Sequence, residues 1–187
     1  GMIVDVGTLV LRMACRQLKE WASSGSTISR VSINVSVVQL NQSDFSSTAV
    51  EVLKDENVNP DSIIIEITES VFIENSDAHI NQLQKIRDSG IMIALDDFGT
   101  GYSSLNYLMR LPVDIIKIDR SMVVRHTDQT CRAILRALSD IARHMNIRCI
   151  AEGIETEEEY RSLVELNYSM IQGWLIAKPM PAEEADR

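Results

Sequence analysis

Two adjacent aspartates, Asp96 and Asp97, end an apolar run at residues 91–95. The run has the pattern of a β-strand that is buried on both faces, and glycines follow at positions 99 and 101. Neighbouring carboxylates repel one another and lose hydration when they are buried. A divalent cation relieves both costs, because Mg²⁺ and related ions prefer carboxylate oxygen. The pair is therefore either part of a metal site or a strand end with two solvated aspartates.

Five further apolar runs carry a polar or ionisable residue within the run or at its end. A single such residue carries little weight, but six runs that share the feature favour a common site. The runs are residues 31–36, 63–69, 114–119, 149–155 and 170–176. Their polar residues are Asn34, Glu66, Glu69, Lys117, Asp119, Glu152, Glu155 and Gln172.

The composition predicts one globular domain over residues 1–187, because 45% hydrophobic content is enough for a sizeable core and excludes disorder. No apolar run is long enough to span a membrane, and no secretory signal is visible. The net charge of −9 argues against a nucleic-acid polymer as partner, but it allows a small anion held through metal ions. The three cysteines form no CxxC pair, so we expect reduced thiols in a cytoplasmic protein.

Helical patterns separate the strand-like runs. Strands separated by helices pair in parallel, because a crossover helix returns the chain to the same edge of the sheet. The carboxyl ends of parallel strands carry the site in such folds, and most of the polar residues lie there. The pattern predicts an α/β parallel barrel, although six strands are evident where a complete barrel has eight. The predicted helices include residues 10–21, 46–54, 77–88, 104–109, 128–145 and 156–166.

Six segments resemble, in chain order, the signature segments of the EAL family. They are residues 32–36, 66–70, 96–105, 117–120, 151–155 and 172–174. EAL proteins are bacterial phosphodiesterases that linearise cyclic di-GMP to pGpG on a TIM-like barrel, with a pair of Mg²⁺ or Mn²⁺ ions. The resemblance covers essentially the whole chain and implies this fold, this ligand and these cofactors.

Site roles follow from the resemblance position by position. Lys117 resembles the lysine that holds the attacking water, and Glu152 the glutamate that helps to activate it or supports the metal shell. Gln172 resembles the glutamine near the substrate. Glu69 resembles the acid that anchors the loop of residues 98–105. The residues that resemble metal ligands, with Asp96 bridging both ions, are Asn34, Glu66, Asp96 and Asp97.

The sequence departs from the family at its start. It contains no Glu-Ala-Leu segment, whose glutamate binds the first metal in the family, and residues 1–12 resemble a later part of the domain. We therefore expect an incomplete barrel that lacks the first two strands and the first helix, with impaired hydrolysis. A homodimer is expected as well, because one short segment cannot replace two strands and a helix.

Three interpretations stay open at this point. The chain is a phosphodiesterase domain, or a degenerate module that binds cyclic di-GMP or a protein without turnover, or a segment cut from a longer enzyme. The parent of such a segment would have room for an N-terminal sensory or GGDEF domain. The missing glutamate favours the binding module for this chain, whereas the rest of the motif set favours the enzyme for its parent.

Overall fold

The computed structural model describes residues 2–42, 44–69, 76–100 and 108–185. The chain divides into two compact units. The first comprises Gly1–Ile93, Arg110–Pro112 and Met180–Arg187, and the second Ala94–Met109 and Val113–Pro179. Within the described part of the chain, no helix combines the length and the apolar character needed to cross a membrane.

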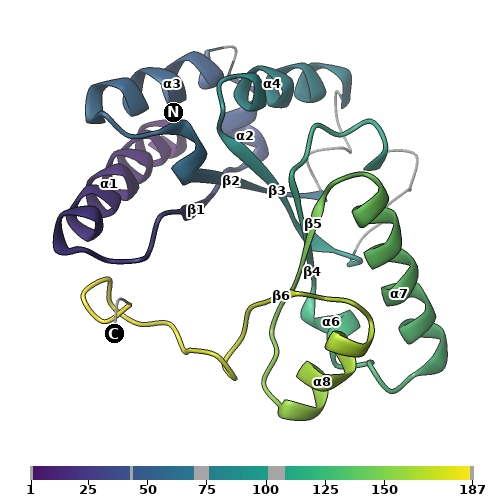
Figure 1. The fold of residues 1–187 in the computed structure, drawn as a ribbon. Coiled ribbons are helices and arrows are strands. Elements are labelled where there is room, and N and C mark those ends of the chain that lie inside the picture. Colours follow the sequence, from purple (N-terminus) through teal and green to yellow (C-terminus); the bar gives the residue numbers. More distant parts are fainter. Residues whose placement is uncertain (1, 43, 70–75, 101–107, 186–187) are drawn as a thin grey trace. The chain divides into compact units, whose positions relative to one another are not determined.

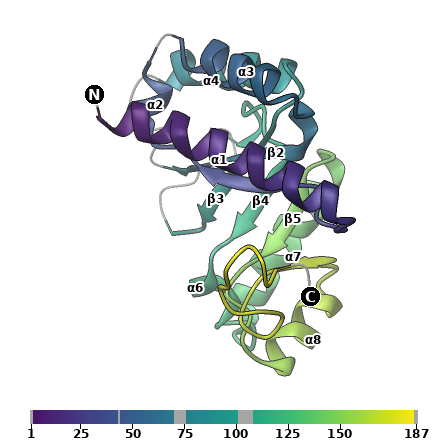
Figure 2. The ribbon, with the colours of Figure 1, turned by 90° about the vertical axis from the view of Figure 1, so that its left-hand side faces the viewer.

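The first unit contains a parallel strand pair and helices that pack beside it. Strand β1 pairs in parallel with β2, and helix α1 packs against both β1 and α3. Figure 2 shows α1 as the long purple helix beside β1. The elements are α1 (Met2–Ser24), β1 (Val31–Asn34), α2 (Val37–Leu40), α3 (Phe45–Glu56), the 3₁₀ helix η1 (Pro60–Ser62), β2 (Ile63–Thr68) and α4 (Ser76–Asp88).

Helix α1 is held to the unit by an apolar stripe and by charge. Leu11, Cys15 and Leu18 recur at helical spacing and are buried. Glu56, at the end of α3, has a side chain that is only 10% exposed. Its carboxylate lies near Arg12 Nη1 (3.6 Å), Arg16 Nε (3.2 Å) and Lys19 Nζ (3.4 Å). A carboxylate is costly to bury unpaired, so these cations of α1 hold the end of α3 against α1.

The second unit contains most of β3 and the three strands that follow it. Strands β3, β4, β5 and β6 pair in parallel in chain order, and α7 packs against β5 (Figure 1). The elements are β3 (Met92–Phe98), β4 (Ile115–Ile118), α6 (Arg120–Val123), α7 (Gln129–His144), β5 (Arg148–Ala151), α8 (Glu157–Glu165) and β6 (Met170–Ile171).

Sequence features explain the borders of the helices in this unit. The Asp128 side chain accepts a hydrogen bond from Cys131 N at 2.7 Å and caps the start of α7. Thr156 and Glu159 form the predicted capping box of α8. The Thr156 side chain accepts a hydrogen bond from Glu159 N, and the Glu159 side chain accepts one from Thr156 N. The buried Tyr168 hydroxyl donates to Leu135 O at 2.9 Å, which ties the chain before β6 to α7.

Most predicted elements are confirmed, with differences at their ends. The strand predicted at 63–68 has these bounds as β2. The last strand ends at Ile171 instead of 176, because Ile176 N bonds back to Gly173 O in a turn. Helix α1 begins at Met2, well before the predicted start. The helix predicted at 104–109 lies mostly outside the described residues.

Candidate metal and catalytic centre

A bulge at the end of β3 places Asp96 and Asp97. The pairing of β3 with β4 shifts register between Leu95 and Phe98. Side chains alternate between faces in a regular strand, and a bulge changes that direction locally. Asp97 has φ of +54°, in the left-handed region, and its N–H donates to Asp96 Oδ1 at 3.0 Å. The irregular backbone therefore allows two consecutive carboxylates to serve one site.

Lys117 lies in the middle of the buried strand β4, with a side chain only 7% exposed. Its Nζ is 3.0 Å from Asp96 Oδ1 and 2.8 Å from Glu152 Oε1. A buried ammonium is costly unless it is paired and hydrogen-bonded, and charge-assisted bonds of this length are strong. Lys117 thus links the acid at the end of β3 to the acid that follows β5.

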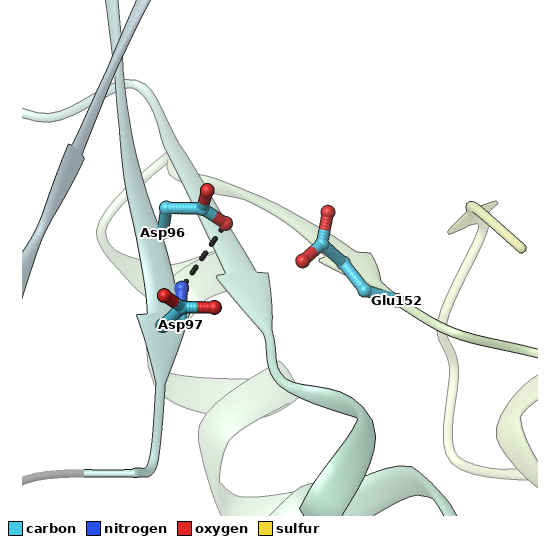
Figure 3. Close-up of side chains that lie close together, drawn as sticks. All are labelled: Asp96, Asp97 and Glu152. Atoms are coloured by element: carbon cyan, nitrogen blue, oxygen red, sulfur yellow. Dashed lines mark hydrogen bonds between the residues drawn. The ribbon is translucent and has the colours of Figure 1, made fainter. Parts of the chain in front are cut away.

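Three carboxylates gather beside this lysine. One oxygen from each of Asp96, Asp97 and Glu152 lies within 4.8 Å of the other two. Figure 3 shows the carboxylates of Asp96 and Glu152 facing one another, with Asp97 directly after Asp96. Oxygen ligands from several acids are the donor set that Mg²⁺, Mn²⁺ and Ca²⁺ prefer. The donor set therefore fits a hard divalent cation.

Gln172 directly follows β6 in the same unit, beside the residues that follow β5. Its N–H donates to Ala151 O at 2.8 Å, and its carbonyl accepts from Ile154 N at 3.1 Å. Glu152 N donates to Ile118 O at 3.0 Å. Hydrogen bonding between strands therefore continues past the ends of β5 and β6, and it brings Glu152 and Gln172 onto adjacent stretches of backbone.

The other predicted site residues belong to the first unit. Asn34 and Glu66 are register partners in the β1–β2 pair, so their side chains leave the same face of the sheet. Glu66 is buried and Asn34 is exposed. Glu69 directly follows β2 and is partly buried, but residues 101–107 of the loop that it is expected to anchor lie outside the described residues. That Asn34 and Glu66 share a metal site with Asp96 and Asp97 stays a prediction.

Asp119 and Glu155, the two acids to which the resemblance assigned no site role, have structural partners. Asp119 caps α6 by accepting from Ser121 N at 2.9 Å. Burial raises its pKa, but the hydrogen bonds from Ser121 outweigh this effect, so the pKa of Asp119 lies below its usual value. Glu155 forms an ion pair with Arg120 at 2.7 Å. The sequence analysis gave Arg120 no role, although it is the last residue of the segment at 117–120 that resembles the family.

The profile of the EAL domain matches residues 1–179. The chain belongs to the EAL domain family. It is 37% identical to the bifunctional diguanylate cyclase/cyclic di-GMP phosphodiesterase MucR of Pseudomonas aeruginosa, over 98% of this chain and 27% of MucR. It is also 37% identical to the cyclic di-GMP phosphodiesterase PdeR of Escherichia coli, over 100% of this chain and 28% of PdeR. This EAL chain thus spans about a quarter of the length of these relatives.

Solved structures confirm the fold expected for an EAL domain. The MucR phosphodiesterase in complex with cyclic di-GMP matches with a TM-score of 0.90 and 36% identity, over 98% of this chain and 75% of that structure. Klebsiella pneumoniae BlrP1, in a manganese and cyclic di-GMP complex, matches with a TM-score of 0.79 and 28% identity, over 92% of this chain and 43% of BlrP1. The α/β fold with parallel strands is therefore that of the EAL-type TIM-like barrel.

Proposed function

We propose that this EAL chain is a cyclic di-GMP-specific phosphodiesterase domain, which hydrolyses one phosphodiester bond and releases pGpG. The observation that carries the proposal is the group of Asp96, Asp97 and Glu152 beside the buried Lys117. Membership of the family, and relatives that are cyclic di-GMP phosphodiesterases, support the choice of substrate.

A pair of Mg²⁺ or Mn²⁺ ions is the proposed cofactor. Asp96 and Asp97 would hold it together with Asn34 and Glu66. When bound, the ions supply charge neutralisation at the scissile phosphate and a lower pKa for a bound water. The manganese complex of BlrP1 supports this assignment for the family, and the oxygen donor set of the second unit supports it for this chain.

The chain's own residues orient the reactants. The Lys117 ammonium would donate a hydrogen bond to the attacking water, and its contacts with both Asp96 and Glu152 support this role. Glu152 would accept the proton of that water or support the metal shell. Gln172, on the adjacent backbone, would bind substrate. Glu69 would order the loop that follows Asp97.

A second candidate function is binding without turnover. The 187 residues contain no Glu-Ala-Leu segment, and loss of a carboxylate ligand weakens the hold on a cation. In that case the site would bind cyclic di-GMP as a sensor or docking module. Release of pGpG from bound ligand separates the two candidates.

The decisive experiment incubates the purified chain with cyclic di-GMP and Mn²⁺ or Mg²⁺, and measures pGpG by chromatography. We expect slow release of pGpG that stops when a chelator is added, and a further loss of at least roughly tenfold in Asp96→Asn, because a metal ligand is removed. Asp61→Asn, an exposed residue of η1, is the matched control and should behave as the parent. Binding of cyclic di-GMP without any pGpG would support the second candidate, and neither binding nor turnover would refute both.

The remaining proposals concern location and partners. We propose that the domain lies in the cytoplasm. Cys15, Cys131 and Cys149 are all free thiols, and a reducing compartment such as the cytoplasm keeps cysteines in that state. Cyclic di-GMP is the proposed small-molecule partner. A sensory or GGDEF domain in the parent protein and a homodimer stay predictions, and light scattering of the purified chain tests the dimer.

A further inference from the structure

The guanidinium of Arg120 holds the backbone directly after Glu152. Arg120 is the first residue of α6, where the chain leaves β4. Its Nη1 donates a hydrogen bond to Gly153 O, and its Nη2 lies 2.7 Å from Glu155 Oε2. One planar cation with several donors thus spans the residues on either side of Ile154, a task that the fork of an arginine performs better than the single ammonium of a lysine.

Gly153 admits the side chain of Arg120 at close range. Its φ of +69° lies in the left-handed region, where glycine is favoured. A Cβ at this position would lie 2.7 Å from Arg120 Cβ and 2.8 Å from Cγ, which is closer than carbon atoms approach without a shift. The stem of Arg120 therefore packs directly on the backbone of Gly153, and the fit depends on the absence of a side chain there.

The other end of the same loop is fixed by Glu159. Its Oε2 accepts hydrogen bonds from Glu155 N at 2.8 Å and Thr156 N at 3.0 Å. Burial raises the pKa of Glu159, but these backbone bonds, together with the nearby charge of Arg120, bring it below the usual value. In the middle, Ile154 N donates to Gln172 O at 3.1 Å and Ile154 O accepts from Leu175 N at 3.0 Å.

We propose that Arg120 is a positioning residue for Glu152. By holding Gly153 and Glu155, it fixes the backbone from which Glu152 reaches Lys117 and the oxygen group shared with Asp96 and Asp97. Glu159 and the Ile154 bonds hold the remainder of the loop, and Arg120 adds the contact with the carbonyl of Gly153, the residue next to Glu152. The effect matters because small misplacements of reacting groups are costly in rate. This inference rests on the proposed function for the identity of the site.

The test compares Arg120→Ala and Arg120→Lys with the parent chain. The control is Arg161→Ala, which removes an exposed arginine of α8 whose ion pair with Glu157 is 3.9 Å long. Three quantities are measured: Mn²⁺ affinity by calorimetry without substrate, amide hydrogen exchange of the peptide that covers residues 152–156, and kcat and KM for cyclic di-GMP.

For Arg120→Ala we expect faster exchange at 152–156 and roughly tenfold weaker Mn²⁺ binding, the lower end of the effect of losing a group that orients a metal ligand. Where the parent hydrolyses cyclic di-GMP, kcat should fall by about tenfold or more while KM changes less. Arg120→Lys should recover part of each loss, and Arg161→Ala should match the parent.

Unchanged Mn²⁺ affinity in Arg120→Ala would overturn the inference. An equal loss of Mn²⁺ affinity in Arg120→Ala and in the control Arg161→Ala would overturn it as well. Faster exchange with parental Mn²⁺ affinity would overturn it too, because the contact would then only stabilise the fold. A parent that binds Mn²⁺ but releases no pGpG refutes the phosphodiesterase function alone, since the affinity and exchange measurements still decide the role of Arg120. A parent that binds no Mn²⁺ refutes both.

Discussion

Asp97 holds a backbone conformation that residues with a side chain seldom adopt. Among the described residues other than glycine, the further ones with positive φ are Asn57, Asn146 and Asn167. Each is an asparagine just after a helix, the residue type and place where the left-handed conformation is best tolerated. Asp97 instead lies on a strand beside Asp96, where the conformation costs about 1–2 kcal/mol. Strain of this kind is typical of functional sites.

Replacing Asp97 should therefore separate stability from function. Asp97→Gly relieves the strain. Its free energy of unfolding should therefore equal that of the parent or exceed it by up to about 1 kcal/mol. Asp97→Ala keeps the unfavourable φ and should be less stable than Asp97→Gly. Both lose a carboxylate and should bind Mn²⁺ at least roughly tenfold more weakly. Urea unfolding and calorimetry measure the two effects, and parental Mn²⁺ affinity in Asp97→Gly would show that Asp97 is no ligand.

At the scale of elements, the contact of α1 with α3 depends on one acid among three cations. Burial raises the pKa of Glu56, but the hydrogen bond from Lys19 and the charge of Arg16 outweigh it, so the pKa lies below its usual value. A lowered pKa in the folded state means that the unfolded chain binds the proton more tightly. The stabilisation is therefore present above the unfolded value of about 4.3, and it is lost as the pH falls through the lower folded value.

Glu56→Gln should remove this pH dependence. The substitution keeps the shape of the side chain but not its charge, so we expect the melting temperature at pH 7 to fall by roughly 2–4 °C. The gap between variant and parent should close as the pH falls below about 4. Glu51→Gln on the exposed side of α3 is the control and should follow the parent. Thermal scans from pH 7 to pH 3 measure both, and a gap that does not narrow between pH 5 and pH 3 would contradict the assignment.

The elements were largely predictable because most of them depend on local pattern. Continuous apolar runs mark β2, β3 and β4, where both faces are covered. The Thr156 capping box marks the start of α8. The pattern failed at the last strand: the apolar residues up to 176 continue past β6 into a turn, in which Ile176 N and Ala177 N bond back to Gly173 O.

The site was predictable in composition but not in geometry. Parallel strands bring their carboxyl ends together, so Asp96, Lys117 and Glu152 were expected to lie close, and the structure places them in contact. The register shift at Asp96 and Asp97 depends on the pairing of β3 with β4. The contact of Arg120 with Gly153 joins the start of α6, after β4, to the loop after β5. Neither leaves a periodic signal in the sequence.

At the scale of the whole molecule, charge opposes the proposed ligand. Cyclic di-GMP carries two negative charges on its phosphodiesters, and the chain has a net charge of −9. At the site, the carboxylates of Asp96, Asp97 and Glu152 gather, and Lys117 pairs with Asp96 and Glu152. Divalent cations change the sign of this local field, because they are the largest charges in such a site. Ligand binding should therefore be coupled to metal binding.

Removal of divalent cations should weaken the binding of cyclic di-GMP far more than it weakens folding. We expect at least roughly tenfold lower affinity in a chelator than with Ca²⁺, a cation of suitable ligand preference, because metal-free binding opposes like charges. Added salt should raise the metal-free affinity slightly, since it screens repulsion between exposed charges. Calorimetric titration of the chain measures both effects, with melting temperatures as the folding control. Equal affinity with and without cations would mean that Asp96, Asp97 and Glu152 take no part in holding the ligand.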